Sequence, residues 1–268
     1  MNRIAETFGR LKRERKRALI PFITAGDPDL KTTRDLLVEL ARAGASLIEL
    51  GVPFTDPMAD GPVIQRASMR ALRNGIDVAK ILDVVRKARE EIDVPVVLFS
   101  YFNPLLQFGA ERLSEEGWRA GVDGVLITDL VPEEAGEFAA TLAKNDLNCI
   151  FLVAPTSTDE RLRMIAERAS GFIYAVARTG VTGAQAEMST EAERLVARVR
   201  DVTDLPIAVG FGISTRAQVR EVWRFAEAAV VGSAVVAEIE KLAGAPDIAS
   251  QVGNLVRTLL SDEPTEEV

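Results

Sequence analysis

Eight short apolar runs, separated by segments with a helical pattern, constrain the fold of this chain more than any other feature. The runs are continuous rather than alternating, which is typical of parallel strands covered on both faces. They are Leu19–Ala25, Leu47–Gly51, Val94–Ser100, Gly124–Thr128, Asn148–Ala154, Gly171–Ala177, Leu205–Phe211 and Ala228–Gly232. Repeated strand–helix units predict an α/β protein with a (βα)8 TIM barrel. A doubly wound open sheet is the alternative, because periodicity does not reveal whether a sheet closes.

Local signals mark the ends of several expected helices. Gly61-Pro62 starts one with proline at the first helical position. The run Pro132–Glu134 predicts the start of the helix after the fourth strand, and Thr190 with Glu193 forms a possible capping box after the sixth. We expect one domain over residues 1–268, whose acidic end, residues 261–268, is frayed.

The N-terminal segment predicts an extra helix before the barrel. Ile4, Phe8 and Leu11 recur at helical spacing, and the basic run Lys12–Arg17 that follows them is interrupted by an acid. We interpret the run as a solvated helix face rather than a targeting signal.

Composition restricts the partners and the compartment. The formal charge of −8 and the pI near 4.9 argue against nucleic acid as a partner. No apolar run reaches the length that a membrane span needs. A single cysteine, Cys149, excludes an internal disulfide and fits a reducing compartment, so we expect a cytoplasmic protein.

The residues that are absent restrict the chemistry. The chain has no histidine, which excludes a Ser-His-Asp triad, a His-Cys pair and a histidine-ligated metal site. Its lysines fall in expected helices and loops rather than at strand ends, which weighs against a Schiff base. Any proton transfer must therefore rest mainly on carboxylates, tyrosines or water.

A carboxylate interrupts the second apolar run. Glu49 lies inside Leu47–Gly51, and burial of an unpaired carboxylate costs several kcal/mol. Strand alternation points Glu49 into the barrel near the end where barrels carry their chemistry. The next loop adds Asp56 and Asp60. A buried acid and an ionised acid can form an acid–base pair; the alternative is a structural, ion-paired glutamate with a turn aspartate.

Three glycine-bearing segments follow the last three expected strands. They are Gly180–Gly183, Gly210–Ser214 and Gly232–Ala234. Barrels often bind phosphate with these loops and a short helix, since glycine admits the anion to backbone N–H groups. The segments predict a site for a phosphate ester of modest size.

Together these segments resemble the tryptophan synthase α subunit family. The resemblance rests on motifs spread in the family's order over nearly the whole chain: Pro21–Pro28, Ile48–Gln65, Arg178–Gly183, Gly210–Ser214 and Gly232-Ser233. It implies a lyase that cleaves indole-3-glycerol phosphate to indole and glyceraldehyde 3-phosphate. It also implies no cofactor in this chain, and a pyridoxal phosphate-dependent β subunit that receives the indole through a tunnel in an α2β2 tetramer.

The resemblance also implies residue roles. Glu49 matches the general acid–base, and Asp60 matches an aspartate that hydrogen-bonds the indole N–H and is expected to stay ionised. Tyr174 lies near the glutamate, and Phe22 lines the indole pocket. The remaining substrate-binding residues are the lid residue Thr182 and the phosphate-binding Gly183, Gly212, Gly232 and Ser233.

Three further positions bear on the resemblance. Asp56 lies in the loop that meets the β subunit. Asp129 stands in a segment with unusual spacing, so its role at the subunit contact stays open. Ser100 is polar where an apolar pocket residue is usual.

Three alternatives to this function remain at this stage. Another phosphosugar barrel, such as a ribulose-phosphate epimerase or a phosphoribosyl isomerase, shares the fold, although such epimerases use metal-binding histidines. A regulatory barrel that only binds a partner, and a lyase active without a β subunit, are the others.

Overall fold

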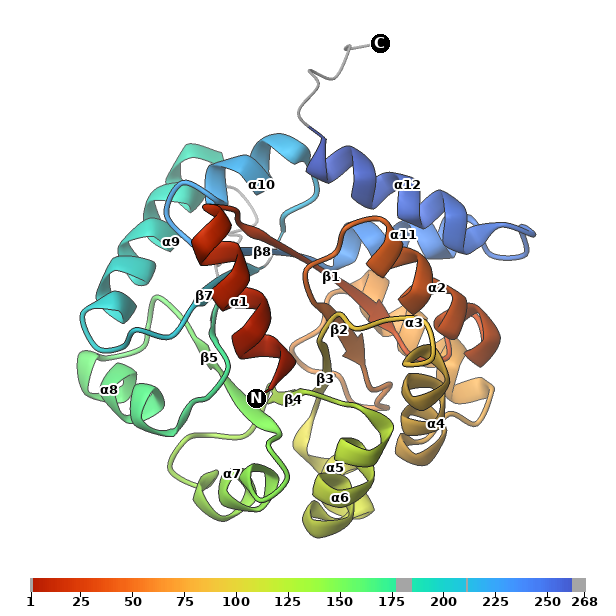
Figure 1. Ribbon diagram of the computed structural model, residues 1–268, viewed down its shortest axis with the longest axis horizontal. Coiled ribbons are helices and arrows are strands. Elements are labelled where there is room, and N and C mark those ends of the chain that lie inside the picture. The colour runs from red at the N-terminus through yellow and green to blue at the C-terminus, as the bar shows by residue number, and fades with distance from the viewer. Residues whose placement is uncertain (1, 177–184, 211, 262–268) are drawn as a thin grey trace.

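Eight parallel strands close into a barrel in the computed structural model, which describes residues 2–176, 185–210 and 212–261. The strands are β1 (Ala18–Thr24), β2 (Ile48–Gly51), β3 (Val96–Ser100), β4 (Gly124–Ile127), β5 (Asn148–Val153), β6 (Ile173–Val176), β7 (Ile207–Gly210) and β8 (Ala228–Val231). They follow one another in chain order, and β1 pairs with β8 to complete the ring (Figure 1). The predicted (βα)8 barrel is confirmed and the open sheet is wrong.

Helices surround this barrel on its outer side, apart from α1, which lies across one end of it (Figure 1). They are α1 (Arg3–Glu14), α2 (Leu30–Arg42), α3 (Pro62–Arg73), α4 (Val78–Ala88), α5 (Phe102–Phe108), α6 (Ala110–Ala120), α7 (Gly136–Ala143), α8 (Asp159–Arg168), α9 (Gln185–Arg200), α10 (Arg216–Val222), α11 (Ser233–Lys241) and α12 (Ile248–Leu260). No helix in the described part of the chain is long and apolar enough to cross a membrane.

Two predicted helix starts are wrong and one is confirmed. Residues 132–134 form a turn, and α7 begins only at Gly136. Thr190 lies inside α9, which already begins at Gln185, so it cannot cap that helix. Gly61 precedes α3 with Pro62 at the first helical position, as predicted. The expected frayed tail lies outside the described residues, apart from Ser261.

Strand alternation separates the barrel interior from the helix layer. Ile48 and Leu50 of β2 belong to the core between strands and helices, whereas Leu47 belongs to the core inside the barrel. Glu49 and Gly51 therefore face inward, as predicted. The interior is filled with side chains, so only its open end offers space for chemistry.

Helix α1 closes the base of the barrel. It crosses the barrel opening that faces the viewer in Figure 1. Ile4 and Phe8 are buried, and the rings of Phe8 and Phe172 lie 5.9 Å apart between centroids. Lys12–Arg17 is exposed, as predicted, but only Lys12–Glu14 belong to the helix, which ends before Arg15. A base closed by α1 leaves the opposite end as the mouth.

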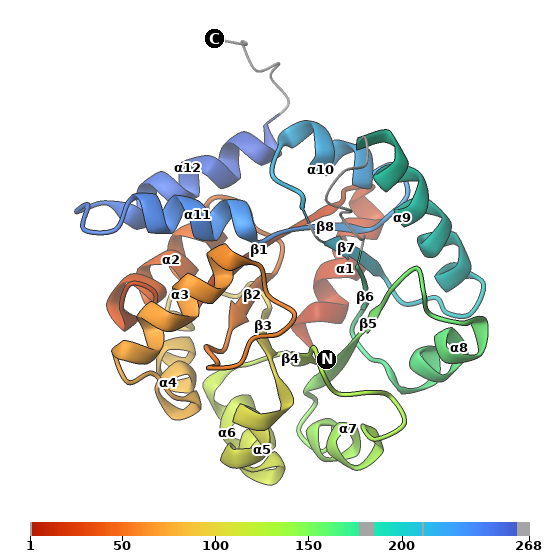
Figure 2. The same cartoon turned by 180° about the vertical axis from the view of Figure 1, so that it is seen from behind.

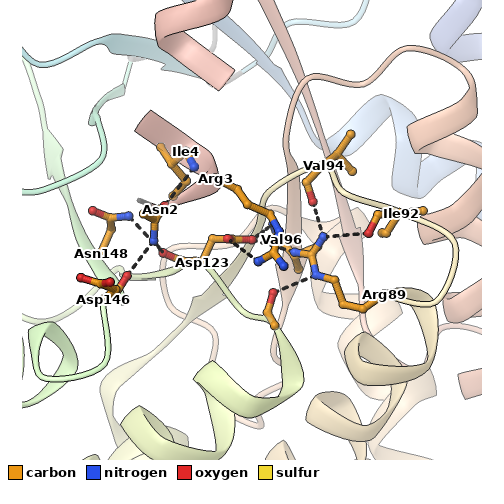
Figure 3. A network of polar contacts seen from close by, with 11 residues as sticks. Asn2, Arg3, Ile4, Arg89, Ile92, Val94, Val96, Asp123, Asp146 and Asn148 are labelled. Carbon is orange, nitrogen blue, oxygen red and sulfur yellow. Dashed lines mark hydrogen bonds and ion pairs between the residues drawn. The ribbon is translucent and has the colours of Figure 1, made fainter. Parts of the chain in front are cut away.

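A polar network fixes this helix to the barrel (Figure 3). The Asp123 carboxylate, with a side chain 3% exposed, accepts hydrogen bonds from Arg89 at 2.7 Å, Arg3 at 3.1 Å and the Val96 N–H at 2.9 Å. Asn2 donates to the Asp123 carbonyl at 2.8 Å. Removal of one partner from such a buried pair costs about 3–5 kcal/mol, so the network rigidifies the base, away from the mouth.

Candidate active site

Glu49 is fully buried near the mouth end of β2. Neither of its carboxyl oxygens has a hydrogen-bond partner among the described residues, and burial raises the pKa of Glu49 to about 8. An ion pair would have lowered this pKa, so the alternative of an ion-paired structural glutamate is wrong within the described part of the chain. At neutral pH the carboxyl group is mostly protonated, which allows it to act as an acid.

Aromatic rings form a wall beside this acid. The Phe22 and Phe99 rings pack edge to face with centroids 5.3 Å apart, and those of Phe99 and Tyr174 lie 6.3 Å apart. Glycines make room for them: a Cβ at Gly51 would lie 2.4 Å from Phe22 Cζ, and one at Gly210 would lie 2.0 Å from the Tyr174 hydroxyl oxygen. The wall suits a flat apolar group such as an aromatic ring system.

Tyr174 on β6 interacts electrostatically with Glu49. Burial, and secondarily the Glu49 charge, raise the pKa of Tyr174 well above its usual value. Tyr174 therefore stays a neutral phenol at every pH at which Glu49 titrates. It can donate a hydrogen bond but cannot serve as the base.

Phe99 was missed by sequence reasoning, which considered Ser100 at the pocket instead. Phe99 packs inside the barrel, so alternation turns Ser100 toward the helix layer. There Ser100 is buried and donates a hydrogen bond to the Tyr101 carbonyl at 2.8 Å. The inward position of Val97 was the available signal, because Phe99 is two residues further along the same strand.

Asp60 stands at the end of the loop from β2, just before α3. Burial raises the pKa of Asp60 to about 6, and a hydrogen bond with Tyr101 opposes this shift. The Tyr101 hydroxyl also accepts the Ala59 N–H at 2.8 Å. Asp60 is half-buried rather than fully wetted, yet a pKa near 6 leaves it mostly ionised at neutral pH, as expected. The sequence did not assign Tyr101 this supporting contact.

The first turn of α11 offers free backbone N–H groups at the mouth. Gly232 precedes the helix, and no side chain of the described residues caps it. Ser233 is exposed at the first position, and Gly212 on the neighbouring loop has a left-handed φ of 74°. A helix N-terminus of this kind favours an anion. The other two expected residues, Thr182 and Gly183, lie outside the described residues.

Ion pairs clamp α3 against α11, and the two helices lie side by side on the face seen in Figure 2. The Arg70 guanidinium donates twice to Asp27, at 2.7 and 2.8 Å, and once to Glu240 at 2.6 Å. Arg66 adds two contacts to Glu240, at 2.8 and 2.7 Å. Since α3 follows Asp60 and α11 follows Gly232, the clamp fixes the acid relative to the anion-binding turn.

Neither a metal site nor a cysteine nucleophile is found among the described residues near this site. The described residues contain no group of three or more potential metal-ligating side chains. Cys149 is buried near the start of β5, where burial raises the pKa of its thiol to about 12. Such a thiol is not a nucleophile at neutral pH.

Fold and site together define a (βα)8-barrel enzyme with an unpartnered acid at the catalytic end of its strands. The sequence profile of the family described as tryptophan synthase alpha chain matches residues 8–261. The chain belongs to that family. It is 50% identical to the tryptophan synthase alpha chain of Geotalea daltonii over 244 residues, which cover 91% of this chain and 92% of the relative.

Solved structures agree with this assignment. Tryptophan synthase subunit alpha from Legionella pneumophila superposes with a TM-score of 0.89 at 37% identity, covering 97% of each chain. A chain from Pyrococcus furiosus, in a structure described as the basis of mutual activation of the tryptophan synthase α2β2 complex, gives a TM-score of 0.84 at 37% identity. It covers 91% of this chain and 97% of the Pyrococcus chain.

Family membership confirms the activity expected from the sequence. The chain is a carbon–carbon lyase of tryptophan biosynthesis that cleaves indole-3-glycerol phosphate to indole and glyceraldehyde 3-phosphate. The alpha chain carries no cofactor, and pyridoxal phosphate belongs to the beta chain. The phosphosugar epimerase or isomerase and the purely regulatory barrel are therefore wrong.

Proposed function

We propose that Glu49 is the single proton carrier of the cleavage reaction. The supporting observation is its burial without any partner, which keeps it protonated at neutral pH. Glu49 first gives its proton to C3 of the indole ring, which leaves the ring positively charged. Its carboxylate then takes the proton of the adjacent glycerol hydroxyl. The carbon–carbon bond breaks, its electrons neutralise the ring, and the hydroxyl oxygen becomes the aldehyde oxygen, with Glu49 protonated again.

Asp60 complements this cycle as the ionised acid. Its carboxylate accepts the indole N–H and stabilises the positive charge that appears on the ring after C3 is protonated. A pKa near 6, against about 8 for Glu49, supports this division of roles, because one acid is charged while the other is neutral. Tyr101 holds the loop through its hydroxyl.

The remaining site residues bind the two ends of the substrate. Phe22, Phe99 and Tyr174 form the wall against which the indole packs. The phosphate group binds at the start of α11, where Gly232 and Ser233 present N–H groups and a hydroxyl. Gly212 extends this grip from the loop after β7. Gly183, expected in the same grip, and Thr182, expected in the lid, lie outside the described residues.

A Gly232→Ala variant tests the phosphate grip. The added Cβ would meet Phe22 Cβ at 3.6 Å, an ordinary contact, so the protein should fold normally. The methyl group should instead crowd the anion and weaken one of its hydrogen bonds, which for a charged partner contributes about 1.5–3 kcal/mol. KM should therefore rise about tenfold or more, with kcat nearly unchanged. Gly136→Ala on α7 is the matched control, because no atom of the described residues lies within 4 Å of its added Cβ. An unchanged KM in the Gly232 variant would place the phosphate elsewhere.

We also infer that the chain works in the cytoplasm as the α subunit of an α2β2 complex. Large apolar side chains are exposed on three successive loops or helices that follow β2, β3 and β4: Met58, Leu106 and Val131, with 87%, 52% and 38% exposure. Such side chains often mark a partner surface. Asp56 is exposed on the first of these loops, whereas Asp129 accepts the Phe102 N–H at 2.7 Å and thus shapes the surface from behind.

Docking and catalysis should be coupled, because the loop that bears Met58 ends at Asp60. A β subunit on this loop can favour the reactive position of Asp60, with a coupling of about 1–3 kcal/mol. Reciprocity then requires glycerol 3-phosphate to tighten the α–β contact by the same factor, about 5–150-fold. The Kd for the β subunit, measured by titration with and without glycerol 3-phosphate, checks this.

Two variants test, in the same titration, whether the surface around Met58 binds the β subunit. Met58→Gln should weaken β-subunit binding. Trp118→Gln, which changes a side chain 57% exposed beside the base of the barrel, should leave the binding unchanged. An equal Kd with and without glycerol 3-phosphate, together with indole release that does not respond to the β subunit, would instead identify a lyase that acts alone.

A further inference from the structure

Thr24 ends β1 with its side chain inside the barrel mouth. Ala18, Ile20 and Phe22 of this strand face the interior, while Leu19, Ile23 and Ala25 pack against the helices. The alternation therefore points the Thr24 side chain inward, two residues nearer the mouth than Phe22. The residue is only 2% exposed, although it stands at the end that substrate must enter.

The Thr24 hydroxyl has no hydrogen-bond partner in the part of the chain that the structure describes. Among the described residues, the only buried side-chain polar atoms without one are the Thr24 hydroxyl oxygen and the two carboxyl oxygens of Glu49. A buried hydroxyl without a partner costs free energy that valine in its place would not. The two unpartnered groups lie on neighbouring strands, since Phe22 is in register with Glu49 and Thr24 with Gly51.

Strand β1 stands between the strands that carry the two ends of the proposed site. It pairs on one side with β2, which bears Glu49, and on the other with β8, which leads into the anion-binding turn at Gly232. A Cβ at Gly232 would lie 3.6 Å from Phe22 Cβ, so the turn adjoins β1 directly. A substrate with its reacting carbon at Glu49 and its phosphate at Gly232 must pass its glycerol chain across the end of β1.

The geometry points to Thr24 as a residue that determines specificity, through a hydrogen bond from its hydroxyl to the middle hydroxyl of the glycerol chain. Glu49 already takes the hydroxyl next to the indole, and α11 takes the phosphate. On the glycerol chain of the substrate, only the middle hydroxyl is then without a partner. Among the buried side chains of the described residues, only the Thr24 hydroxyl is then without one. This inference rests on the proposed placement of Glu49 and the phosphate grip. A site built to bind a substrate hydroxyl rejects the analogue that lacks it.

A pair of small ligands isolates this contact from catalysis. Glycerol 3-phosphate carries the middle hydroxyl, and 1,3-propanediol monophosphate differs only by its absence. The native chain should bind glycerol 3-phosphate about tenfold more tightly, the size of a net hydrogen bond at the upper end of its range. Thr24→Val should bind both ligands equally, at the affinity that the native chain has for the propanediol compound. Thr24→Ser, which keeps the hydroxyl, should retain most of the discrimination.

The melting temperature of Thr24→Val, compared with that of a matched threonine variant, separates a ligand-binding role of Thr24 from a structural one. Thr24→Val replaces an unpartnered hydroxyl with an apolar group of equal shape, so its melting temperature should equal or exceed that of the native chain. Thr33 is the control: its buried hydroxyl accepts the Gly26 N–H and donates to the Asp29 carbonyl, both at 2.8 Å. Thr33→Val should lower the melting temperature and leave the ligand preference unchanged.

The outcomes are distinct. Persistent preference for glycerol 3-phosphate in Thr24→Val would overturn the assignment of Thr24 while leaving the phosphate grip intact. Equal binding of the two ligands by the native chain would do the same. If neither ligand bound the native chain at millimolar concentration, the phosphate grip itself would fail, and the inference about Thr24 with it.

Discussion

Replacement of Glu49 by glutamine is expected to lower the rate of indole release by about 10²–10⁴-fold or more, the range for loss of a general acid–base. Glutamine keeps the shape of the side chain but can neither give nor take the proton. The phosphate grip lies at the turn between β8 and α11, away from Glu49, so substrate should still bind and KM should change little. Steady-state indole release from indole-3-glycerol phosphate, with and without a β subunit, measures this.

The same substitution should stabilise the fold as the pH rises. The pKa of Glu49 is about 8 in the folded protein against 4.5 for the free group. A raised pKa gives stability that is complete below pH 4.5 and is lost as the pH rises toward 8. Glutamine has no such loss, so its advantage should grow across this window. Between pH 4.5 and pH 7 the native chain should lose about 3 kcal/mol of unfolding free energy relative to the glutamine variant.

Glu115→Gln is the control for both measurements. Glu115 pairs with Arg119 on the surface of α6, where its side chain is 57% exposed. Its removal should change neither turnover nor the dependence of stability on pH. If Glu49→Gln kept more than a tenth of the native turnover, Glu49 would not be the proton carrier.

The second large effect concerns Asp60. Asp60→Asn removes the negative charge that faces the indole N–H, and loss of one electrostatic contact to a transition state costs about 10²–10³-fold in turnover. The loss should appear in the free chain and in the complex. An exposed aspartate, Asp83, supplies the control variant Asp83→Asn.

The pH dependence of kcat/KM distinguishes a catalytic role of Asp60 from a structural one. In the native chain kcat/KM should rise as Asp60 ionises near pH 6 and fall as Glu49 loses its proton near pH 8. In Asp60→Asn the rise near pH 6 should disappear, while the fall near pH 8 remains. If the rise persisted, another group would be responsible for it.

The sequence predicted the barrel because strand and helix signals were regular. Continuous apolar runs such as Leu47–Gly51 indicated buried parallel strands, and Glu49 was conspicuous as the one carboxylate inside such a run. Its inward direction followed from alternation alone. The helix start at Gly61-Pro62 also needed only local information.

Features that depend on tertiary contacts were not predictable. The clamp of Arg70 on Asp27 and Glu240 joins segments far apart in the chain, and no local pattern pairs them. The roles of Thr24 and Phe99 depend on side chains from neighbouring strands, which only the closed barrel brings next to them. The predicted cap at Thr190 failed because α9 begins upstream of it, at Gln185.

The protonation of Glu49 is the central claim, and direct titration of its carboxyl carbon tests it. In the free chain labelled with ¹³C at glutamate side chains, the resonance that is absent from Glu49→Gln belongs to Glu49. Its chemical shift should titrate with a pKa of about 8. A pKa near 4.5, the value of an ordinary glutamate, would mean that Glu49 is ionised at neutral pH and cannot protonate the indole ring.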